Sequence, residues 1–272
     1  MIELYNENCI GVMESFDPEI IDLTVTSPPY DNLRTYNNNS SWDFKTFKKI
    51  AKQLFRITKK GGVIVWVVND ATINGSETGT SFKQALYFKK IGFNIHDTMI
   101  WKKPNFRFLN HNRYEQCFEF MFVFSKGKPK TVNTIRVPCK YAGHAYHQIY
   151  YDKNGKKRGP NTKNLVVRDT KIKNNIWTIA CGQDKNSSKY GFHPAKFPER
   201  LVYDHIISWS NKRDTVFDPF LGSGTTGKIA LINKRNFIGC EIDKIYFKMS
   251  VECITKSQGL FYKDEIKIQS KF

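Results

Sequence analysis

The sequence reads Asp218-Pro219-Phe220-Leu221-Gly222-Ser223-Gly224-Thr225-Thr226-Gly227 where an expected buried strand, Thr215 to Asp218, meets an expected helix that begins near Thr225. Gly222 and Gly224 allow a sharp turn and let backbone N–H groups approach a ligand. The helix that follows points its positive dipole end at the turn. The stretch therefore predicts a small-molecule site at the end of this strand, in an α/β sheet.

Two cofactor classes fit this loop. Its glycines satisfy the G-x-G-x-x-G pattern of dinucleotide-dependent oxidoreductases. The carboxylate of Asp218 argues against that class, because it would repel a pyrophosphate but attract the ammonium and sulfonium groups of S-adenosylmethionine (AdoMet). Glu241 follows the next expected strand, Asn236 to Cys240, where a carboxylate can accept hydrogen bonds from ribose hydroxyls. The loop favours AdoMet and leaves the dinucleotide alternative open.

A second motif, Thr26-Ser27-Pro28-Pro29-Tyr30, follows the apolar strand expected from Asp22 to Thr26. The prolines fix φ and lack N–H groups, so they hold an extended loop in which the Ser27 hydroxyl and the Pro28 carbonyl can accept hydrogen bonds. Two acceptors on an exocyclic amino group, with the Tyr30 ring stacked on the base, would make the amino nitrogen nucleophilic toward a methyl sulfonium. The alternative is a Pro-Pro turn that merely ends a strand.

Together, TSPPY early and DPFLGSGTTG late resemble the amino-methylating DNA methyltransferases of the β class, over nearly the whole chain. The resemblance implies a permuted AdoMet-dependent sheet, mostly parallel with an antiparallel strand pair. It also implies methyl transfer to the exocyclic amino nitrogen of a flipped DNA base, with Ser27, Pro28, Pro29 and Tyr30 as the catalytic residues. Ser before Pro-Pro is usual in this family for cytosine N4, and Asp or Asn for adenine N6. Cytosine N4 is therefore expected, with adenine N6 as the alternative.

The remaining alternatives are an RNA methyltransferase, whose glycine loop usually comes first, and a DNA-binding protein without catalysis. The resemblance also implies an AdoMet site. Asn8 stands where relatives commonly have Asp, and would accept a hydrogen bond from adenine through its amide oxygen. His193 and Pro194 begin a segment that resembles the one bordering the methionine end of AdoMet. The other expected cofactor residues are Asp218, Pro219, Phe220, Gly222, Ser223, Gly224, Thr225, Thr226 and Glu241.

The positive charge is concentrated in one part of the chain. Residues 126–192 hold 15 Lys and Arg against three Asp, or 12 of the 18 net positive charges. Such an excess favours a polyanionic partner. We therefore expect a target-recognition region at 126–192, between catalytic (1–125) and AdoMet-binding (193–272) parts of one methyltransferase domain, and a hairpin around Asn154-Gly155. Candidate DNA-binding residues are Arg34, Arg107, His111, Arg113, Lys140, Lys156, Lys157 and Arg158.

No apolar run approaches the roughly 20 residues that cross a bilayer, so no membrane association and a cytoplasmic location are expected. Four residues, Cys139, His144, His147 and Cys181, fit no common zinc spacing, and no metal is expected. The resemblance makes double-stranded DNA the expected partner, and it allows a cognate restriction endonuclease, as in restriction-modification systems, and a homodimer.

Overall fold

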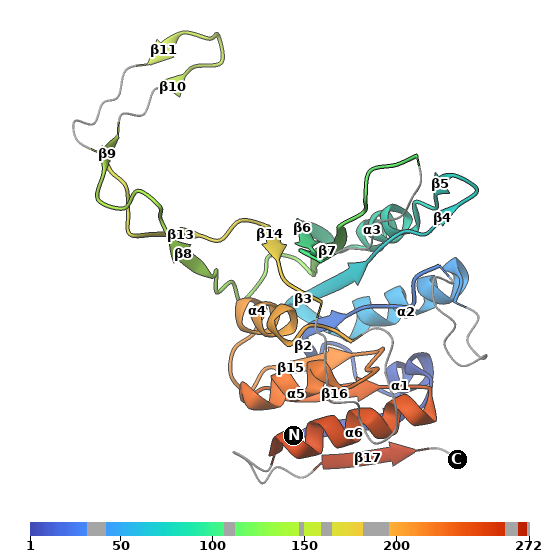
Figure 1. Cartoon of the computed structure of the whole chain (residues 1–272). Helices are drawn as coiled ribbons and strands as arrows, with labels where there is room; N and C mark the ends of the chain where they lie inside the picture. The colour runs from blue at the N-terminus through green and yellow to red at the C-terminus, as the bar shows by residue number, and fades with distance from the viewer. Residues whose placement is uncertain are drawn as a thin grey trace. The chain divides into compact units, whose positions relative to one another are not determined.

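The protein is described by a computed structural model over residues 1–31, 42–105, 112–146, 150–158, 165–181, 196–258 and 266–270. Two compact units make up the chain: residues 1–133 with 175–272, and residues 134–174. The first unit is built on a large sheet (Figure 1). Its strands are β1 (Ile2–Asn6), β2 (Ile21–Thr26), β3 (Thr58–Val68), β6 (Asn94–Lys102), β7 (Phe118–Ser125), β14 (Ile176–Thr178), β15 (Thr215–Asp218), β16 (Asn236–Cys240) and β17 (Ile266–Ser270).

The strand order among the described residues is β14-β6-β7-β3-β2-β15-β16-β1-β17. Only β7 runs antiparallel to its neighbours, β6 and β3, and every other described pair in this sheet is parallel. The predicted antiparallel pair is therefore confirmed, and β1 lies beside β16. A parallel order that places strands from the two ends of the chain side by side is the permuted arrangement expected from the order of the two motifs.

Helices cover both faces of the sheet. Those of the first group, which contact one another in series, are α1 (Cys9–Glu14), α2 (Phe44–Ile57) and α3 (Thr80–Lys90). Those of the second group are α4 (Glu199–Trp209), α5 (Thr225–Ile232) and α6 (Lys244–Gln258). The predicted helix start near Thr225 is confirmed by α5, and Asp43 caps α2 by accepting a hydrogen bond from the Thr46 N–H at 2.6 Å.

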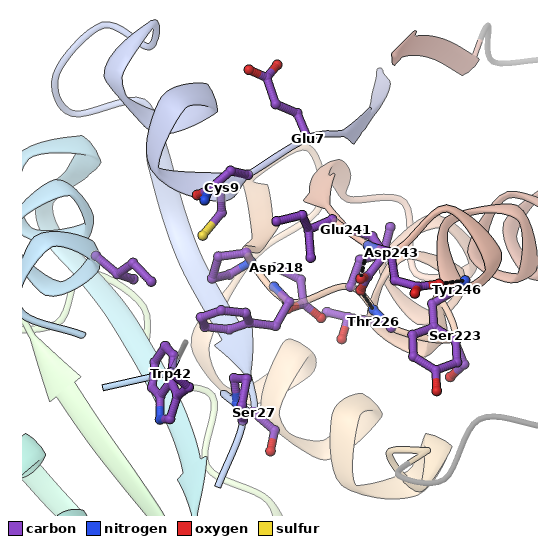
Figure 2. A pocket seen from close by; sticks show the side chains of 18 of the residues that line it. Glu7, Cys9, Ser27, Trp42, Asp218, Ser223, Thr226, Glu241, Asp243 and Tyr246 are labelled. Carbon is purple, nitrogen blue, oxygen red and sulfur yellow. Dashed lines mark hydrogen bonds between the residues drawn. The ribbon is translucent and has the colours of Figure 1, made fainter. Parts of the chain in front are cut away.

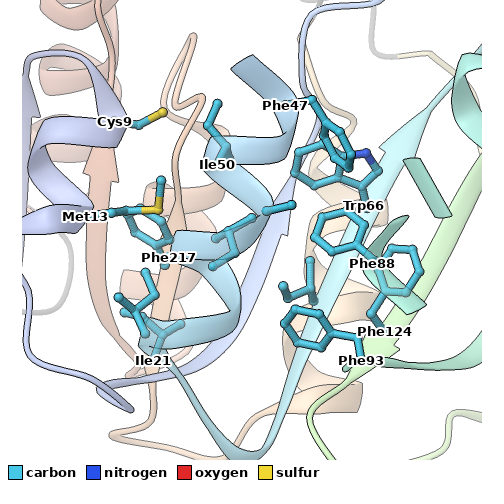
Figure 3. Packing of buried hydrophobic residues seen from close by; sticks show 14 of the residues in the cluster. Cys9, Met13, Ile21, Phe47, Ile50, Trp66, Phe88, Phe93, Phe124 and Phe217 are labelled. Atoms are coloured by element: carbon cyan, nitrogen blue, oxygen red, sulfur yellow. The ribbon is translucent and has the colours of Figure 1, made fainter. Parts of the chain in front are cut away.

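The core between the first helix group and the sheet is largely aromatic (Figure 3). Phe47 of α2 and Phe88 of α3 meet edge-on with ring centroids 5.3 Å apart, and Trp66 of β3 lies 5.2 Å from Phe88. All three side chains are fully buried. Edge-to-face pairs add about 0.5–1.5 kcal/mol each to the burial of their area, so this cluster helps to hold α2 and α3 against β3.

The described residues of the second unit form three short antiparallel pairs. These are β8 (Arg136–Pro138) with β13 (Thr170–Ile172), β9 (Ala145–Tyr146) with β12 (Leu165–Val166), and β10 (Tyr150–Tyr151) with β11 (Lys157–Arg158). The predicted hairpin is confirmed: Gly155 has φ 74°, and Asp152 accepts hydrogen bonds from the N–H groups of Asn154 and Lys156 at 3.0 Å. A further small pair, β4 (Thr72–Ile73) with β5 (Ser76–Glu77), belongs to the first unit.

Candidate active site

The two predicted motifs meet at one edge of the sheet. β2 carries the catalytic motif at its end and lies parallel to β15, which carries the glycine loop, with Leu23 opposite Val216 and Thr24 opposite Phe217. At the ends of these strands the Thr26 hydroxyl donates to Asp218 Oδ1 at 2.6 Å. Both residues are buried, so this hydrogen bond joins two motifs that are 192 positions apart in the sequence.

A cavity of about 380 Å³ lies at this edge (Figure 2). Its volume falls within the range of about 300–1,000 Å³ that is usual for small-ligand sites. Residues of both the TSPPY motif and the glycine loop line it, whereas Pro28, Tyr30 and Gly224 are not among its lining residues. The predicted site residues that line it are Asn8, Ser27, Pro29, Asp218, Pro219, Phe220, Gly222, Ser223, Thr225, Thr226 and Glu241.

The glycine loop has the predicted turn geometry. Gly222 and Gly224 have φ of 53° and 85°, in the left-handed region that favours glycine, and α5 begins directly afterwards at Thr225. A Cβ on Gly224 would lie 2.8 Å from the Cα of Ser250 in α6. The loop therefore needs glycine at this position both for its conformation and for close packing against α6.

Asp218 is almost completely buried at the end of β15. Burial raises the pKa of its carboxyl from 3.8 to about 6, while hydrogen bonds from Thr26, Thr226 and the Phe220 N–H act in the opposite direction. The Phe220 N–H donates to the same Oδ1 atom at 3.1 Å. Two carboxylate oxygens offer about four acceptor sites, so Asp218 can still accept from a ligand ammonium. A buried carboxylate that lines the cavity fits a cationic ligand group.

Glu241 lies at the end of β16, also with its side chain buried against the cavity. Its Oε2 accepts from the Gly222 N–H at 2.8 Å and its Oε1 from the Asp243 N–H at 2.9 Å. Burial raises the pKa of this carboxyl to about 7, against those two hydrogen bonds. Glu241 thus braces the glycine turn, a structural contact that the sequence prediction did not include.

Asn8 has a structural role that was not predicted. Its Oδ1 caps α1 by accepting a hydrogen bond from the Ile10 N–H at 2.9 Å. An amide oxygen has two lone pairs, so the predicted hydrogen bond from an adenine to the same oxygen stays a prediction. The N-cap preference of Asn was a signal in the sequence for this role of the oxygen.

Sequence reasoning missed several residues of the cavity wall. Trp42 lines it and packs edge-on against Phe220, with ring centroids 5.5 Å apart. Cys9, Phe197 and Tyr246 also contribute to the lining, and burial raises the pKa of the Cys9 thiol to about 12, so it is a packing residue and no nucleophile. Two signals in the sequence could have identified them. Cys9 follows the predicted site residue Asn8, and Trp42 is an aromatic residue directly before the α2 cap, Asp43.

The catalytic loop carries a hydrogen-bonded chain. The Ser27 hydroxyl donates to the Tyr30 oxygen at 2.9 Å, and the Tyr30 hydroxyl donates to Glu119 Oε2 at 2.8 Å. Glu119 lies in β7, with only 6% of its surface exposed, and its Oε1 pairs with the ammonium of Lys103. No local sequence signal marked Glu119, because strand pairing brings it to a loop 89 positions away.

The predicted DNA-binding residues fall into two groups. Within the first unit, Arg113 donates to the Gly75 carbonyl and lies 3.9 Å from Glu77, beside the β4–β5 pair. Within the second unit, Lys156 and Lys157 are exposed around the hairpin, Arg158 ends β11, and the Lys140 ammonium lies 5.3 Å from the Tyr141 ring centroid. Five predicted site residues lie outside the described residues: Arg34, Arg107, His111, His193 and Pro194.

Comparison with known proteins shows the family to which the chain belongs. The sequence profile of the DNA methylase family, which comprises N6 and N4 methyltransferases, matches residues 21–252. The orphan methyltransferase M.BamHII of Bacillus amyloliquefaciens is 51% identical over 85% of this chain and 88% of its own length. This chain belongs to the DNA methylase family. The DNA adenine methyltransferase YhdJ of Escherichia coli is 27% identical over 97% of the chain and 86% of its own length.

Solved structures share the fold of this DNA methylase. The cytosine-N4-specific PvuII DNA methyltransferase has a TM-score of 0.69 at 20% identity, over 98% of this chain and 95% of that one. M1.HpyAVI, solved as a complex with AdoMet, has a TM-score of 0.59 at 23% identity, over 93% and 99%. The chain is an AdoMet-dependent DNA amino-methyltransferase. Among the described residues, no helix combines the length and apolar character needed to span a membrane.

Proposed function

We propose that this DNA methylase transfers the methyl group of AdoMet to the N4 amino nitrogen of a flipped cytosine. The observation that carries the proposal is Ser27, which precedes Pro28-Pro29 and lines the same cavity as Asp218 and Glu241. In the family that the chain resembles, Ser at this position is usual for cytosine N4. The alternative is adenine N6, which the printed name of one relative, an adenine methyltransferase, keeps open.

The proposed roles combine the family resemblance with the side chains that line the cavity. Asp218 accepts a hydrogen bond from the AdoMet ammonium, Glu241 accepts hydrogen bonds from the ribose hydroxyls, and the Asn8 amide oxygen accepts one from the adenine. Ser27 and the Pro28 carbonyl accept the N–H bonds of the target amino group, while the Tyr30 ring stacks on the base. Because the amino group is inside a duplex, the base must first be flipped out, which costs roughly a few kcal/mol.

For target recognition we propose residues 126–192, with the hairpin of β10 and β11 as its cationic tip. Its exposed Lys156 and Lys157 would neutralise phosphates and release counterions. Three further predictions accompany this proposal: a cognate restriction endonuclease and a homodimer, which the resemblance allows, and a cytoplasmic location, which was expected from the lack of a long apolar run. The relative that is 51% identical is named an orphan methyltransferase, so the endonuclease is the least supported of the three.

Nucleoside analysis tests the choice of base. DNA is incubated with the purified protein and AdoMet and is then digested to nucleosides. The nucleosides are analysed by mass spectrometry against standards of N4-methyldeoxycytidine and N6-methyldeoxyadenosine. The proposal predicts N4-methyldeoxycytidine with wild-type protein and a strong loss of product with Ser27→Ala. A product of N6-methyldeoxyadenosine would replace the proposed base with the alternative, and no methylated DNA on any sequence would remove the proposed function.

A further inference from the structure

Methyl transfer needs acceptors at the target amino group, because both of its hydrogens are donors. Serine is ambiguous in this respect: its hydroxyl has one hydrogen as well as two lone pairs. If the Ser27 hydrogen pointed at the amino group, donor would face donor. The hydrogen bonds around Ser27 remove this ambiguity. They involve Glu119, which belongs neither to the TSPPY motif nor to the residues that line the cavity.

The direction of the chain is set at its buried end. The carboxylate of Glu119 can only accept, so it takes the Tyr30 hydrogen, at 2.8 Å. The Tyr30 oxygen then takes the Ser27 hydrogen, at 2.9 Å. A second acceptor near Tyr30, the Val67 carbonyl, is 3.4 Å away, and the shorter distance favours the carboxylate. With its hydrogen so engaged, Ser27 presents only lone pairs to the cavity.

The positive charge of Lys103 offsets the free-energy cost of burying the Glu119 carboxylate. Its ammonium pairs with Glu119 Oε1, the oxygen that Tyr30 does not use, and lies 4.9 Å from the Trp101 ring centroid. An ammonium has donors only. The atom of residue 119 that faces Lys103 must therefore be an acceptor, whichever atom of that residue faces Tyr30.

We propose that Glu119 is a positioning residue for methyl transfer, which orients the Ser27 hydroxyl through Tyr30 as an obligate acceptor for the target amino group. This inference rests on the proposed role of Ser27 in DNA amino-methylation. It assigns Glu119 no contact with substrate. Glu119 instead sets the donor–acceptor direction of two hydrogen bonds, Tyr30 to Glu119 and Ser27 to Tyr30. Replacing one carboxylate oxygen by an NH2 group can reverse that direction.

Glu119→Gln performs that reversal. Lys103 needs an acceptor, so the amide oxygen turns to it and the amide NH2 faces Tyr30. Tyr30 then donates to Ser27, which at 2.9 Å is closer than the Val67 carbonyl at 3.4 Å, and Ser27 points its hydrogen at the base. The single-turnover rate should fall about 10- to 100-fold, as for other misplaced catalytic groups, with the AdoMet dissociation constant unchanged. Glu252→Gln, which loses an ion pair with Lys256 on α6, is the control and should keep the wild-type rate.

Lys103→Met in the Glu119→Gln background distinguishes positioning from a structural role. Without the ammonium, the amide is free to turn its oxygen toward Tyr30, so the double variant should react at least several-fold faster than Glu119→Gln alone. A merely structural loss would be additive, and the second substitution would make the rate worse. Wild-type rate in Glu119→Gln, or no recovery in the double variant, overturns the proposal.

If Glu119→Gln fails to fold, Tyr30→Phe alone keeps the proposal falsifiable. Phenylalanine removes the hydroxyl that links Ser27 to Glu119, so single-turnover methylation should slow, and a wild-type rate for Tyr30→Phe contradicts the inference. Where Glu119→Gln folds, adding it to Tyr30→Phe should have no further effect on the rate, and a further loss in the double variant contradicts the inference. Failure of the proposed function itself looks different, because wild-type protein would then methylate no DNA.

Discussion

Replacing Asp218 by Asn tests the cofactor site through two opposite effects. Asn keeps the shape of the side chain and an oxygen for the Thr26 hydroxyl and the Phe220 N–H, but it removes the charge. If Asp218 holds the AdoMet ammonium, the variant binds AdoMet more weakly by about 1–3 kcal/mol, or about 5- to 150-fold in dissociation constant. If burial opposes the charge, the same variant is more stable without ligand.

The stability gain follows from the pKa. Burial raises the pKa of Asp218 from 3.8 to about 6, so the folded protein binds this proton more tightly than the unfolded chain. The associated stability is fully present below about pH 4 and is lost as pH rises through about 6. Two pKa units correspond to about 3 kcal/mol. Asp218→Asn should therefore raise the ligand-free unfolding free energy by up to about 3 kcal/mol at pH 8, and by almost nothing near pH 4.

The assays are titration calorimetry with AdoMet and urea unfolding of the ligand-free protein at several pH values. Wild-type affinity for AdoMet should weaken as pH falls through about 6, because Asp218 is then protonated, and Asp218→Asn should lack that part of the pH dependence. Glu241, with its pKa of about 7, contributes a separate change that both proteins share. An unchanged dissociation constant in Asp218→Asn would refute the contact between Asp218 and the AdoMet ammonium. An unchanged unfolding free energy at pH 8 would refute the idea that burying the ionised Asp218 destabilises the ligand-free protein.

Three further predictions concern other parts of the molecule. Gly224→Ala should lower the unfolding temperature more than Gly75→Ala, because both glycines have positive φ but only Gly224 would place a Cβ against Ser250; equal losses would contradict this. Thr26→Val should lower the unfolding free energy in urea at pH 8 by about 1.5–3 kcal/mol, since Asp218 loses a donor, and an unchanged value would remove that hydrogen bond from the account. Neutralising Lys156, Lys157 and Arg158 together should flatten the log–log salt dependence of DNA binding by up to about 2.7, without changing AdoMet affinity, and identical slopes would show that the hairpin does not contact phosphate.

Much of the first unit was predictable, because its signals are local. A buried strand, a glycine turn and a helix start occur within a few residues around Asp218, and the apolar runs predicted β2, β3 and β16. The edge strands were not predicted. β14 has three residues inside a polar basic stretch, and β17 alternates isoleucine with polar residues over only five positions, so neither has a pattern long enough to stand out.

The site divides in the same way. The motif residues were predicted to share a cavity, and Ser27 and Asp218 do line one. The interactions of those residues with the rest of the protein were not predicted, because they depend on pairing between distant strands. Thr26 contacts Asp218, and Tyr30 contacts Glu119, only because β2, β15, β3 and β7 are ordered as they are. Local sequence identifies the chemistry, whereas the sheet order determines which groups orient it.

If the Ser27 loop is the chemical centre of a cofactor site that it shares with Asp218, Ser27→Ala loses one acceptor at the target amino group and keeps the rest of the pocket. Single-turnover methylation by this variant is measured with saturating AdoMet and DNA, and both affinities are measured on the same preparation. We expect a large fall in the methyl-transfer rate while both dissociation constants stay near wild type. A wild-type transfer rate in Ser27→Ala would make the Pro-Pro loop a scaffold and not the chemical centre.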